Sequence, residues 1–304
     1  MILLRFSLAL GCALAPLAAL GSLAPAGPVG PVGPGAPAIP ATPAPQDPGE
    51  ARGPLSAEQL ALEATLAEQG VRLDTRRGLV SIPAQVAVPD ELLEYLLVGP
   101  AGASHESAFT TGVSPSVLNV ALLALGLEAG ANASWTPKDP APSEEQLRAG
   151  VSPYDVHLPA GDGLYIYVAW RAGEELYFFR VEDLIRNLMR GHSMERHRWI
   201  YLGSRMVPDG KGGEDFAAEV YHNLICVSFF GEGYTLATGA LEDCVEQTIW
   251  MANAWLLPEP GTAVRFLLAR SPLDVFPADQ LGDLPDVLAP EGSETLAPEG
   301  SEPR

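Results

Sequence analysis

The feature that most constrains the fold of this sequence is a pair of alternating apolar segments around a short turn. GLYIYVAW precedes the turn Arg171-Ala172-Gly173-Glu174 and ELYFFRV follows it. Side chains that alternate between apolar and polar on both sides of a Gly-containing turn are typical of an antiparallel β-hairpin. The chain is therefore expected to fold around an antiparallel sheet.

Further strands and a few helices are expected on both sides of this hairpin. Alternation around Arg77-Gly78 predicts a second hairpin, and later strands are expected at LLEYLLVG, RWIYLGS, NLICVSFF and AVRFLLAR. Helices are expected at residues 57–69, 114–125 and 182–190, with a short one around 242–252. Residues 128–163, rich in Pro, Ala, Gly and charge, predict a long surface excursion. Without regular strand–helix alternation, the pattern favours an α+β fold: a single domain with a largely antiparallel sheet covered by two or three helices.

The first 21 residues predict a secretory signal peptide. Arg5 is followed by an apolar stretch up to Leu23, and Ala19-Leu20-Gly21 offers the small residues at which signal peptidases cut. Two alternatives stay open, namely an uncleaved membrane anchor and a lipid-modified Cys12. In each case we expect a periplasmic or secreted protein of the cell envelope.

Both ends of the remaining chain predict disorder around one domain. In residues 22–54, Pro recurs at every third place from Pro25 to Pro43, a period typical of a polyproline II tether. Residues 271–304 contain the tandem octad LAPEGSET-LAPEGSEP and are expected to be an acidic disordered tail. The folded domain is therefore expected at residues 55–270.

Acidic side chains dominate the sequence, with 38 Asp and Glu against 18 Lys and Arg and a net charge of −20. Proteins that bind nucleic acids present a cationic surface to the phosphates, so no nucleic-acid partner is expected. The expected partner is an unknown envelope ligand or protein. Contact with a membrane is expected only through the N-terminal segment, if that segment is retained or acylated.

The triplet His105, Glu106 and Ser107 is the first candidate site. It follows a predicted strand and places a proton carrier, a carboxylate and a hydroxyl in one loop. Three consecutive side chains rarely converge as a catalytic triad, however. The alternative is that Glu106 and Ser107 cap the loop and the following helix through backbone hydrogen bonds.

A second candidate set, His192, Glu195 and His197, is a weak candidate for a metal site. The two histidines are five residues apart, which places them about 140° apart on a helix and on opposite faces of a strand. Only a loop would let both hold one ion, so no metal and no other cofactor is expected. The surrounding arginines either receive an anionic ligand or pair with nearby acids: Arg186, Arg190, Arg196, Arg198 and Arg205, with Glu182, Asp183 and Glu195 as the acids.

Two cysteines remain once Cys12 is set aside with the signal. In an oxidising compartment, Cys226 and Cys244 would allow a disulfide. The alternative is that Cys226, which lies in an apolar strand, is a free thiol acting as a small core residue.

Three ordered segments carry a family resemblance: LEYLLVGPAGASHESAFTTGVSPSVLNVALLALGLEAG, HRWIYLGS and NLICVSFF. Together they resemble the YdjY-domain family of secreted bacterial proteins, in particular its planctomycete members, over roughly residues 71–268. The resemblance implies an exported α+β domain, and it implies no established activity, cofactor or catalytic residue. It marks Glu106 and Ser107 as the family's characteristic pair without giving them a role.

Two functional hypotheses follow. The leading one is an exported protein whose domain binds a ligand or partner without catalysis. The alternative is a hydrolase that uses His105 and Glu106 as acid and base, either without a metal or with one held partly by His192 and His197.

Overall fold

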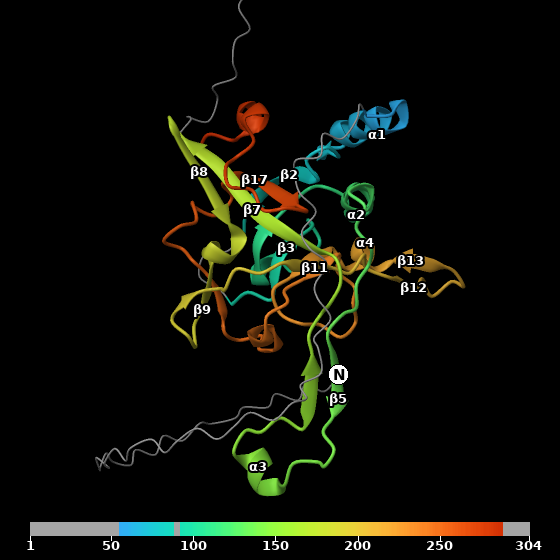
Figure 1. Cartoon of the computed structure of the whole chain (residues 1–304), viewed down its shortest axis with the longest axis vertical. Coiled ribbons are helices and arrows are strands. Elements are labelled where there is room, and N and C mark those ends of the chain that lie inside the picture. Colours follow the sequence, from blue (N-terminus) through green and yellow to red (C-terminus); the bar gives the residue numbers. More distant parts are fainter. Residues whose placement is uncertain (1–54, 88–91, 288–304) are drawn as a thin grey trace, which may run out of the picture. The chain divides into compact units, whose positions relative to one another are not determined.

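The computed structural model describes residues 55–87 and 92–287 (Figure 1). The predicted signal peptide, the tether, Cys12 and the tandem octads lie outside the described residues. Within the described ranges, no helix is both long and apolar enough to span a membrane.

Strands make up most of the regular structure. The helices are α1 (Ala57–Glu68), α2 (Pro115–Ala124), α3 (Glu144–Arg148) and α4 (Ala217–Tyr221). Short 3-10 turns are η1 (Ser104–Glu106), η2 (Val181–Leu184), η3 (Glu242–Val245) and η4 (Ala278–Asp283). The main sheet contains β1 (Arg72–Asp74), β2 (Leu79–Val86), β3 (Tyr95–Val98), β4 (Ser107–Thr110), β7 (Gly163–Ala172), β8 (Glu175–Arg180), β11 (Trp199–Tyr201), β14 (Asn223–Cys226), β15 (Ala237–Thr238) and β17 (Ala263–Ala269).

Eight of these strands close into a mixed barrel. The order is β2-β17-β7-β11-β15-β14-β3-β4, and β4 returns to β2 through the pairs Gln85↔Thr110 and Val86↔Phe109. Most neighbours are antiparallel, but β3 with β4 and β14 with β15 are parallel. Two strands pair with ring strands without being part of the ring. β1 pairs with residues 79–81 of β2, and β8 pairs with β7.

The expectation of an open, largely antiparallel sheet covered by helices is therefore wrong. The sequence predicted six of the eight ring strands but neither β4 nor β15, and it did not predict the order in which the strands pair. Alternation with a period of two predicts which side chains share a face of the sheet. It does not predict whether the two end strands pair with each other and so close the sheet into a barrel. The two parallel pairs arise between short strands joined by irregular loops, without the long helical crossover that usually signals a parallel pair.

Alternation along the long strands sorts side chains into two apolar clusters. The even-numbered residues of β2, β7 and β17 belong to the main core, with Ile82, Val168 and Phe266 as buried examples. Odd-numbered residues such as Tyr167 and Leu267 belong to a smaller cluster on the outer face. The interior is thus filled by packed side chains, as in other small barrels.

The outer cluster is covered by residues 271–287, which the sequence assigned to the disordered tail. Phe276 and Leu284 are buried in it, and the Leu273 backbone N–H donates to the hydroxyl of Tyr167 at 2.7 Å. The backbone of Val287 then donates to the carbonyl of Arg171. The packed domain therefore continues to Val287, beyond the expected boundary at residue 270.

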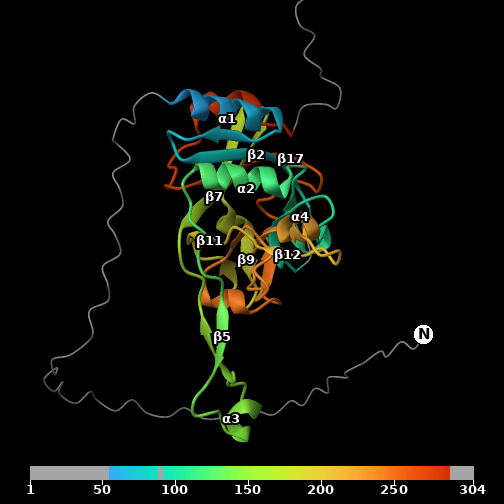
Figure 2. The same ribbon diagram turned by 90° about the vertical axis from the view of Figure 1, so that its right-hand side faces the viewer.

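Smaller sheets flank the barrel. One joins β9 (Ile185–Asn187), β10 (His192–Ser193) and β16 (Trp250–Ala252) in the order β10-β9-β16. Another pairs β12 (Met206–Pro208) with β13 (Glu214–Phe216), and a third pairs β5 (Ser134–Pro137) with β6 (Tyr154–His157). With α3 between its strands, the β5–β6 ribbon forms an arm that extends away from the barrel (Figures 1 and 2).

Local signals predicted several elements correctly. The Ser56–Gln59 capping box begins α1, and both predicted hairpins, β1–β2 and β7–β8, are present. α2 begins at Pro115 and buries Leu118, Ala121 and Leu122. The excursion at residues 128–163 is the arm.

Two predicted helices are wrong. Residues 182–190 form the η2 turn and the start of the β9–β10 hairpin, since the Asn187 side chain accepts from the backbone N–H groups of Met189 and Arg190. This local turn competes with the helical hydrogen bonds. Around 242–252 the chain forms the η3 turn followed by β16.

The loop between β3 and β4 is tied to the start of β14. Gly99 donates its backbone N–H to the His222 carbonyl at 2.7 Å, and Ala103 donates to Asn223 Oδ1 at 3.1 Å. A Cβ on Gly102 would lie 2.6 Å from the His222 carbonyl oxygen. The two backbones approach so closely that only glycine fits at position 102.

We expect Gly102→Ala to lower the free energy of unfolding by about 1–3 kcal/mol, because the added methyl group meets backbone that cannot move freely. Chemical denaturation measures the change. Gly112→Ala is the matched control, since a Cβ there meets nothing within 4 Å. Equal stability of the two variants would contradict the close approach.

Candidate functional site

The predicted triplet lies at one end of the barrel but does not converge. His105 and Glu106 belong to η1, and their side chains are 77% and 40% exposed, with 3.7 Å between His105 Nε2 and Glu106 Oε1. Ser107 is buried, and its hydroxyl donates to the Phe109 carbonyl at 2.8 Å. The hydroxyl is thus engaged by a backbone carbonyl within β4 and does not cap α2, whose N-cap Ser114 makes no side-chain cap hydrogen bond.

Glu94 and Tyr95, at the start of β3, adjoin this triplet. Burial, followed by the neighbouring Glu106 carboxylate, raises the pKa of Glu94, and burial also raises the pKa of the Tyr95 hydroxyl. The Tyr95 ring stacks on Phe230 at 5.2 Å between centroids. The loop is therefore bordered by a packed aromatic pair, Tyr95 and Phe230, and by two neighbouring carboxyl groups, Glu94 and Glu106.

The second predicted set is divided between surface and interior. His192 begins β10, is exposed, and its Nδ1 lies 2.6 Å from the Ser193 carbonyl oxygen. The His197 side chain is only 8% exposed, and its Nδ1 contacts the Glu195 carbonyl oxygen at 3.0 Å. Across the described ranges, no three His, Cys, Asp or Glu residues gather in a metal-binding group.

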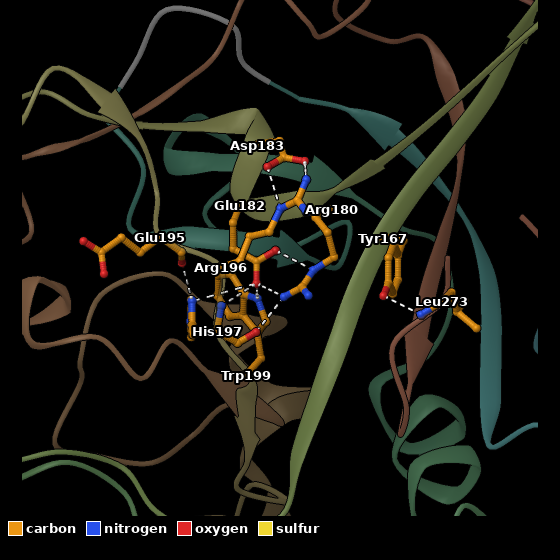
Figure 3. A network of polar contacts seen from close by, with 9 residues as sticks. All are labelled: Tyr167, Arg180, Glu182, Asp183, Glu195, Arg196, His197, Trp199 and Leu273. Atoms are coloured by element: carbon orange, nitrogen blue, oxygen red, sulfur yellow. Dashed lines mark hydrogen bonds and ion pairs between the residues drawn. The ribbon is translucent and has the colours of Figure 1, made fainter. Parts of the chain in front are cut away.

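A buried network surrounds His197 (Figure 3). Its centre is the fully buried carboxylate of Glu182, which forms an ion pair with Arg180. Trp199 Nε1 also donates to this carboxylate at 3.2 Å, and the His197 backbone N–H donates at 3.3 Å. Arg180 in turn donates to the His197 carbonyl at 2.6 Å. Each charge is therefore compensated inside the protein, as a buried ion pair requires.

Aromatic rings enclose the cationic partner of this pair. The Arg180 guanidinium lies 5.1 Å from the Tyr165 ring centroid and 5.5 Å from that of Tyr167. Such placement favours a cation that has lost most of its water. The network thus fixes where β8 ends and where the chain turns through η2 into β9.

Next to the network, Asp183 pairs with the more exposed Arg196. Arg196 Nε lies 3.0 Å from Asp183 Oδ1, and Nη2 lies 2.7 Å from Oδ2. Of the two readings of the arginine cluster, pairing with neighbouring acids therefore holds for Arg196. Arg190 also pairs, but with Asp243 from η3, a residue outside the predicted acidic set.

A cavity of about 140 Å³ lies where the β9–β10 hairpin meets η3 and β16. His192, Asn187 and Trp250 occupy facing positions across the three strands, so they form one row on the sheet. Asn187 Nδ2 donates to Asp243 Oδ2 at 2.9 Å, which connects this row to η3.

The charged lining of the cavity is mostly acidic. Asp243 forms an ion pair with Arg190, and the hydrogen bond between them is the main cause of the raised pKa of Arg190. The Glu195 and Glu242 carboxylates raise this pKa to a smaller extent. All four side chains line the cavity. The carboxylates thus outnumber the guanidinium three to one.

The match to known families decides where the protein belongs. Residues 71–269 match the family model described as the YdjY domain, which is most of the chain. The chain belongs to the YdjY-domain family. No curated protein and no solved structure matches the chain.

In this YdjY domain the two cysteines are not bridged. Cys226 and Cys244 are both free thiols, and burial raises the pKa of each to about 12. Cys226 Sγ contacts Thr235 Oγ1 at 3.5 Å, while Cys244 Sγ packs against Gly239. Buried thiols with raised pKa values are poor nucleophiles, so both act as core residues.

Sequence reasoning named Glu182 only as a partner for the arginine cluster, and it missed Arg180, Asp243 and Trp250. Arg180 had a weak signal, since Arg180 and Glu182 place two opposite charges around an apolar Val181 at the end of a strand. Asp243 and Trp250 had none, because they join the site only through the pairing of β16 with β9.

Glu182→Ala is expected to lower the free energy of unfolding by about 3–5 kcal/mol, because it leaves the Arg180 charge buried without its partner. Denaturant titration measures the loss. Asp183→Ala removes an adjacent carboxylate from a more exposed pair and is expected to cost about 1 kcal/mol or less. Similar losses in both variants would show that Glu182 is not the centre of the network.

Acidification is expected to destabilise the domain through His197. Burial lowers the pKa of His197 from 6.5, although the Glu195 carbonyl and the Glu182 carboxylate oppose the shift. The unfolded chain then binds the proton first, so stability falls as the pH drops below about 6.5 and levels off below the folded-state pKa.

Unfolding free energies at pH values from about 7.5 to 5 test this expectation. His197→Gln removes the titrating ring, so its stability should fall less over this interval than that of the wild type. His105→Gln leaves His197 in place and should retain the loss. Parallel pH profiles for the wild type and His197→Gln would contradict the assignment.

Proposed function

We propose that this YdjY-domain protein is an exported cell-envelope protein that binds a partner protein without catalysis, and that the arm provides the contact surface. The observation that carries the proposal is the amphipathic β5–β6 ribbon. Export is proposed from the apolar N-terminal stretch of the sequence, with Arg5 before it and small residues after it.

The register of the ribbon separates two faces. Trp135 lies opposite Val156 and Pro137 opposite Tyr154, and directly paired residues in an antiparallel ribbon share a face. This apolar face alternates with a polar face: Ser134, Thr136, Asp155 and His157.

The apolar face is only partly covered by the domain itself. Val156 packs against the main core, whereas Trp135 is 36% and Tyr154 46% exposed. Leu147, in the α3 segment between the strands, is also exposed, at 44%. A two-stranded ribbon is marginally stable alone, so exposed aromatic side chains along it favour a surface that a partner covers.

The charge of the arm favours a basic partner. Residues 128–163 carry six acidic side chains, Glu128, Asp139, Glu144, Glu145, Asp155 and Asp162, against Lys138 and Arg148. A second copy would bring the same acidic surface, and like charges repel. The proposed partner is therefore an envelope protein that presents basic residues around an apolar patch.

The hydrolase alternative receives no support from the geometry. His105 and Glu106 are exposed, while the Ser107 hydroxyl is buried and engaged by a backbone carbonyl. His192 and His197 lie on another part of the fold and share no contact with the triplet among the described residues.

Photo-crosslinking in living cells tests the proposal. We expect p-benzoylphenylalanine in place of Trp135 or Tyr154 to give one discrete heteromeric product in the envelope fraction. Raising the salt concentration should lower the yield, because screening weakens the attraction between the acidic arm and a basic partner.

The same probe in place of Thr136 is the matched control, because it lies on the opposite face of the same strand. Equal products from both faces, or a product with the mass of two copies of this chain, would overturn the proposed contact. Recovery of the protein in the cytosolic fraction would overturn the proposed export.

A further inference from the structure

The main sheet keeps one long unpaired edge, on the outer side of β8. Within the described part of this sheet, β1 and β8 are the strands that pair on one side only. β1 is three residues long, carries the charged Arg72 and Asp74, and contacts α1. β8 has six residues, and Figure 1 shows no further strand of the sheet beside its outer edge. This edge is therefore the place at which the sheet can be extended.

The pairing of β7 determines which backbone groups of β8 face this edge. Arg171 of β7 donates its N–H to the Pro285 carbonyl and accepts from the Val287 N–H, so both of its backbone groups point away from β8. Directly opposite residues of an antiparallel pair either bond each other or both point outward. Leu176 lies opposite Arg171, so its N–H and C=O face the unpaired edge, and the period of two extends this to Phe178. Among the described residues, no backbone hydrogen bond engages Leu176 or Phe178 on this side.

The edge also lacks the features that usually prevent a strand from pairing with another chain. Natural edge strands carry Pro, Lys or a β-bulge for this purpose. β8 has the sequence ELYFFR and a continuous register with β7, so it contains none of the three. Leu176 is 44% exposed, and Phe178 is only partly buried against the outer cluster. An added strand would therefore cover apolar side chains as well as satisfy backbone groups.

The charge beside this edge is negative. Glu174 and Glu175, at the turn that begins β8, are exposed. Asp286 lies at the same turn, where its Oδ1 accepts from the Gly173 N–H at 3.0 Å. Arg171 is the guanidinium at this turn and donates to the Gly173 carbonyl. Three carboxylates against one guanidinium favour a basic partner.

We propose that β8 binds an extended, basic segment of a partner protein as an added strand of the main sheet. The backbone of the segment exchanges hydrogen bonds with Leu176 and Phe178, and its alternate apolar side chains contact these two residues. Its basic side chains lie near Glu174 and Glu175. A second copy of this chain would instead bring the same two carboxylates to the interface. The site includes no residue of the arm, so it holds or fails separately from the contact proposed there.

Three labelled octapeptides test the proposal by fluorescence anisotropy on the full chain at low salt. We expect a peptide of alternating lysine and valine to bind saturably with one site per chain. A peptide of alternating lysine and glycine has the same charge without the apolar side chains and should bind about tenfold more weakly or not at all. A peptide of alternating glutamate and valine should not bind, because its charge is repelled.

Two variants of one residue then test the backbone contact. Leu176→Pro removes the outward N–H without removing a hydrogen bond to β7, since the N–H at this position faces away from that strand. It is expected to weaken binding of the lysine–valine peptide about tenfold. Leu176→Val keeps the N–H and a β-branched apolar side chain, so it is the matched control and should bind as the wild type does. Circular dichroism spectra check that both variants fold.

Hydrogen exchange on the wild type locates the bound peptide without any substitution. The amides of Leu176 and Phe178 should exchange more slowly once the lysine–valine peptide is bound. Protection of the β5–β6 ribbon in place of β8 would overturn the proposal.

Other outcomes would also contradict it. These are the absence of saturable binding, equal affinity for the lysine–glycine peptide, and equal affinity of Leu176→Pro and Leu176→Val. A wild type that sediments as a dimer, with a monomeric Leu176→Pro variant, would assign the edge to a second copy and overturn the choice of partner.

Discussion

Closure of the backbone hydrogen-bond ring is the constraint on which the rest of this structure depends. β2 pairs with β17 from Leu79 to Gln85 and reaches β4 through Gln85 and Val86. Once the ring is closed, the even-numbered side chains of its long strands have only the interior available, and they fill it. Because packed side chains fill the interior, the proposed contact with a partner uses the arm, which lies outside the ring.

The buried Arg180–Glu182 pair connects the ring to the candidate site. It sits where β8 leaves the barrel, and its carboxylate also holds the His197 backbone and Trp199. This anchoring fixes the ends of the β9–β10 hairpin, on which Glu195 and His192 reach the cavity. One wall of the cavity is therefore positioned by a network in which Arg180 and Glu182 compensate each other's charge.

Sequence reasoning succeeded where local chemistry decides the structure. The Ser56–Gln59 capping box and Pro115 mark helix starts, and Gly173 marks the turn of the longest hairpin; each works through neighbouring backbone groups. It failed at residues 182–190, where the helical spacing of apolar residues was outweighed by Asn187 and by the long-range partners of Glu182. The same limit applies to the site, since no pattern in the sequence relates Asp243 to Arg190 or Trp250 to His192.

By itself, the sequence determined the longer strands of the main sheet, the starts of α1 and α2, the acidic character of the chain and its membership of the YdjY-domain family. Only the tertiary structure decided that the sheet closes, that residues 271–287 complete the domain, and that Cys226 and Cys244 are not bridged. It also decided that His105 is exposed, whereas His197 is buried beside Glu182. The physical reason is the range of the interactions. Alternation, capping and turn formation act within a few residues, whereas ring closure and charge pairing join segments far apart in the chain, and their outcome depends on which partners the whole fold brings together.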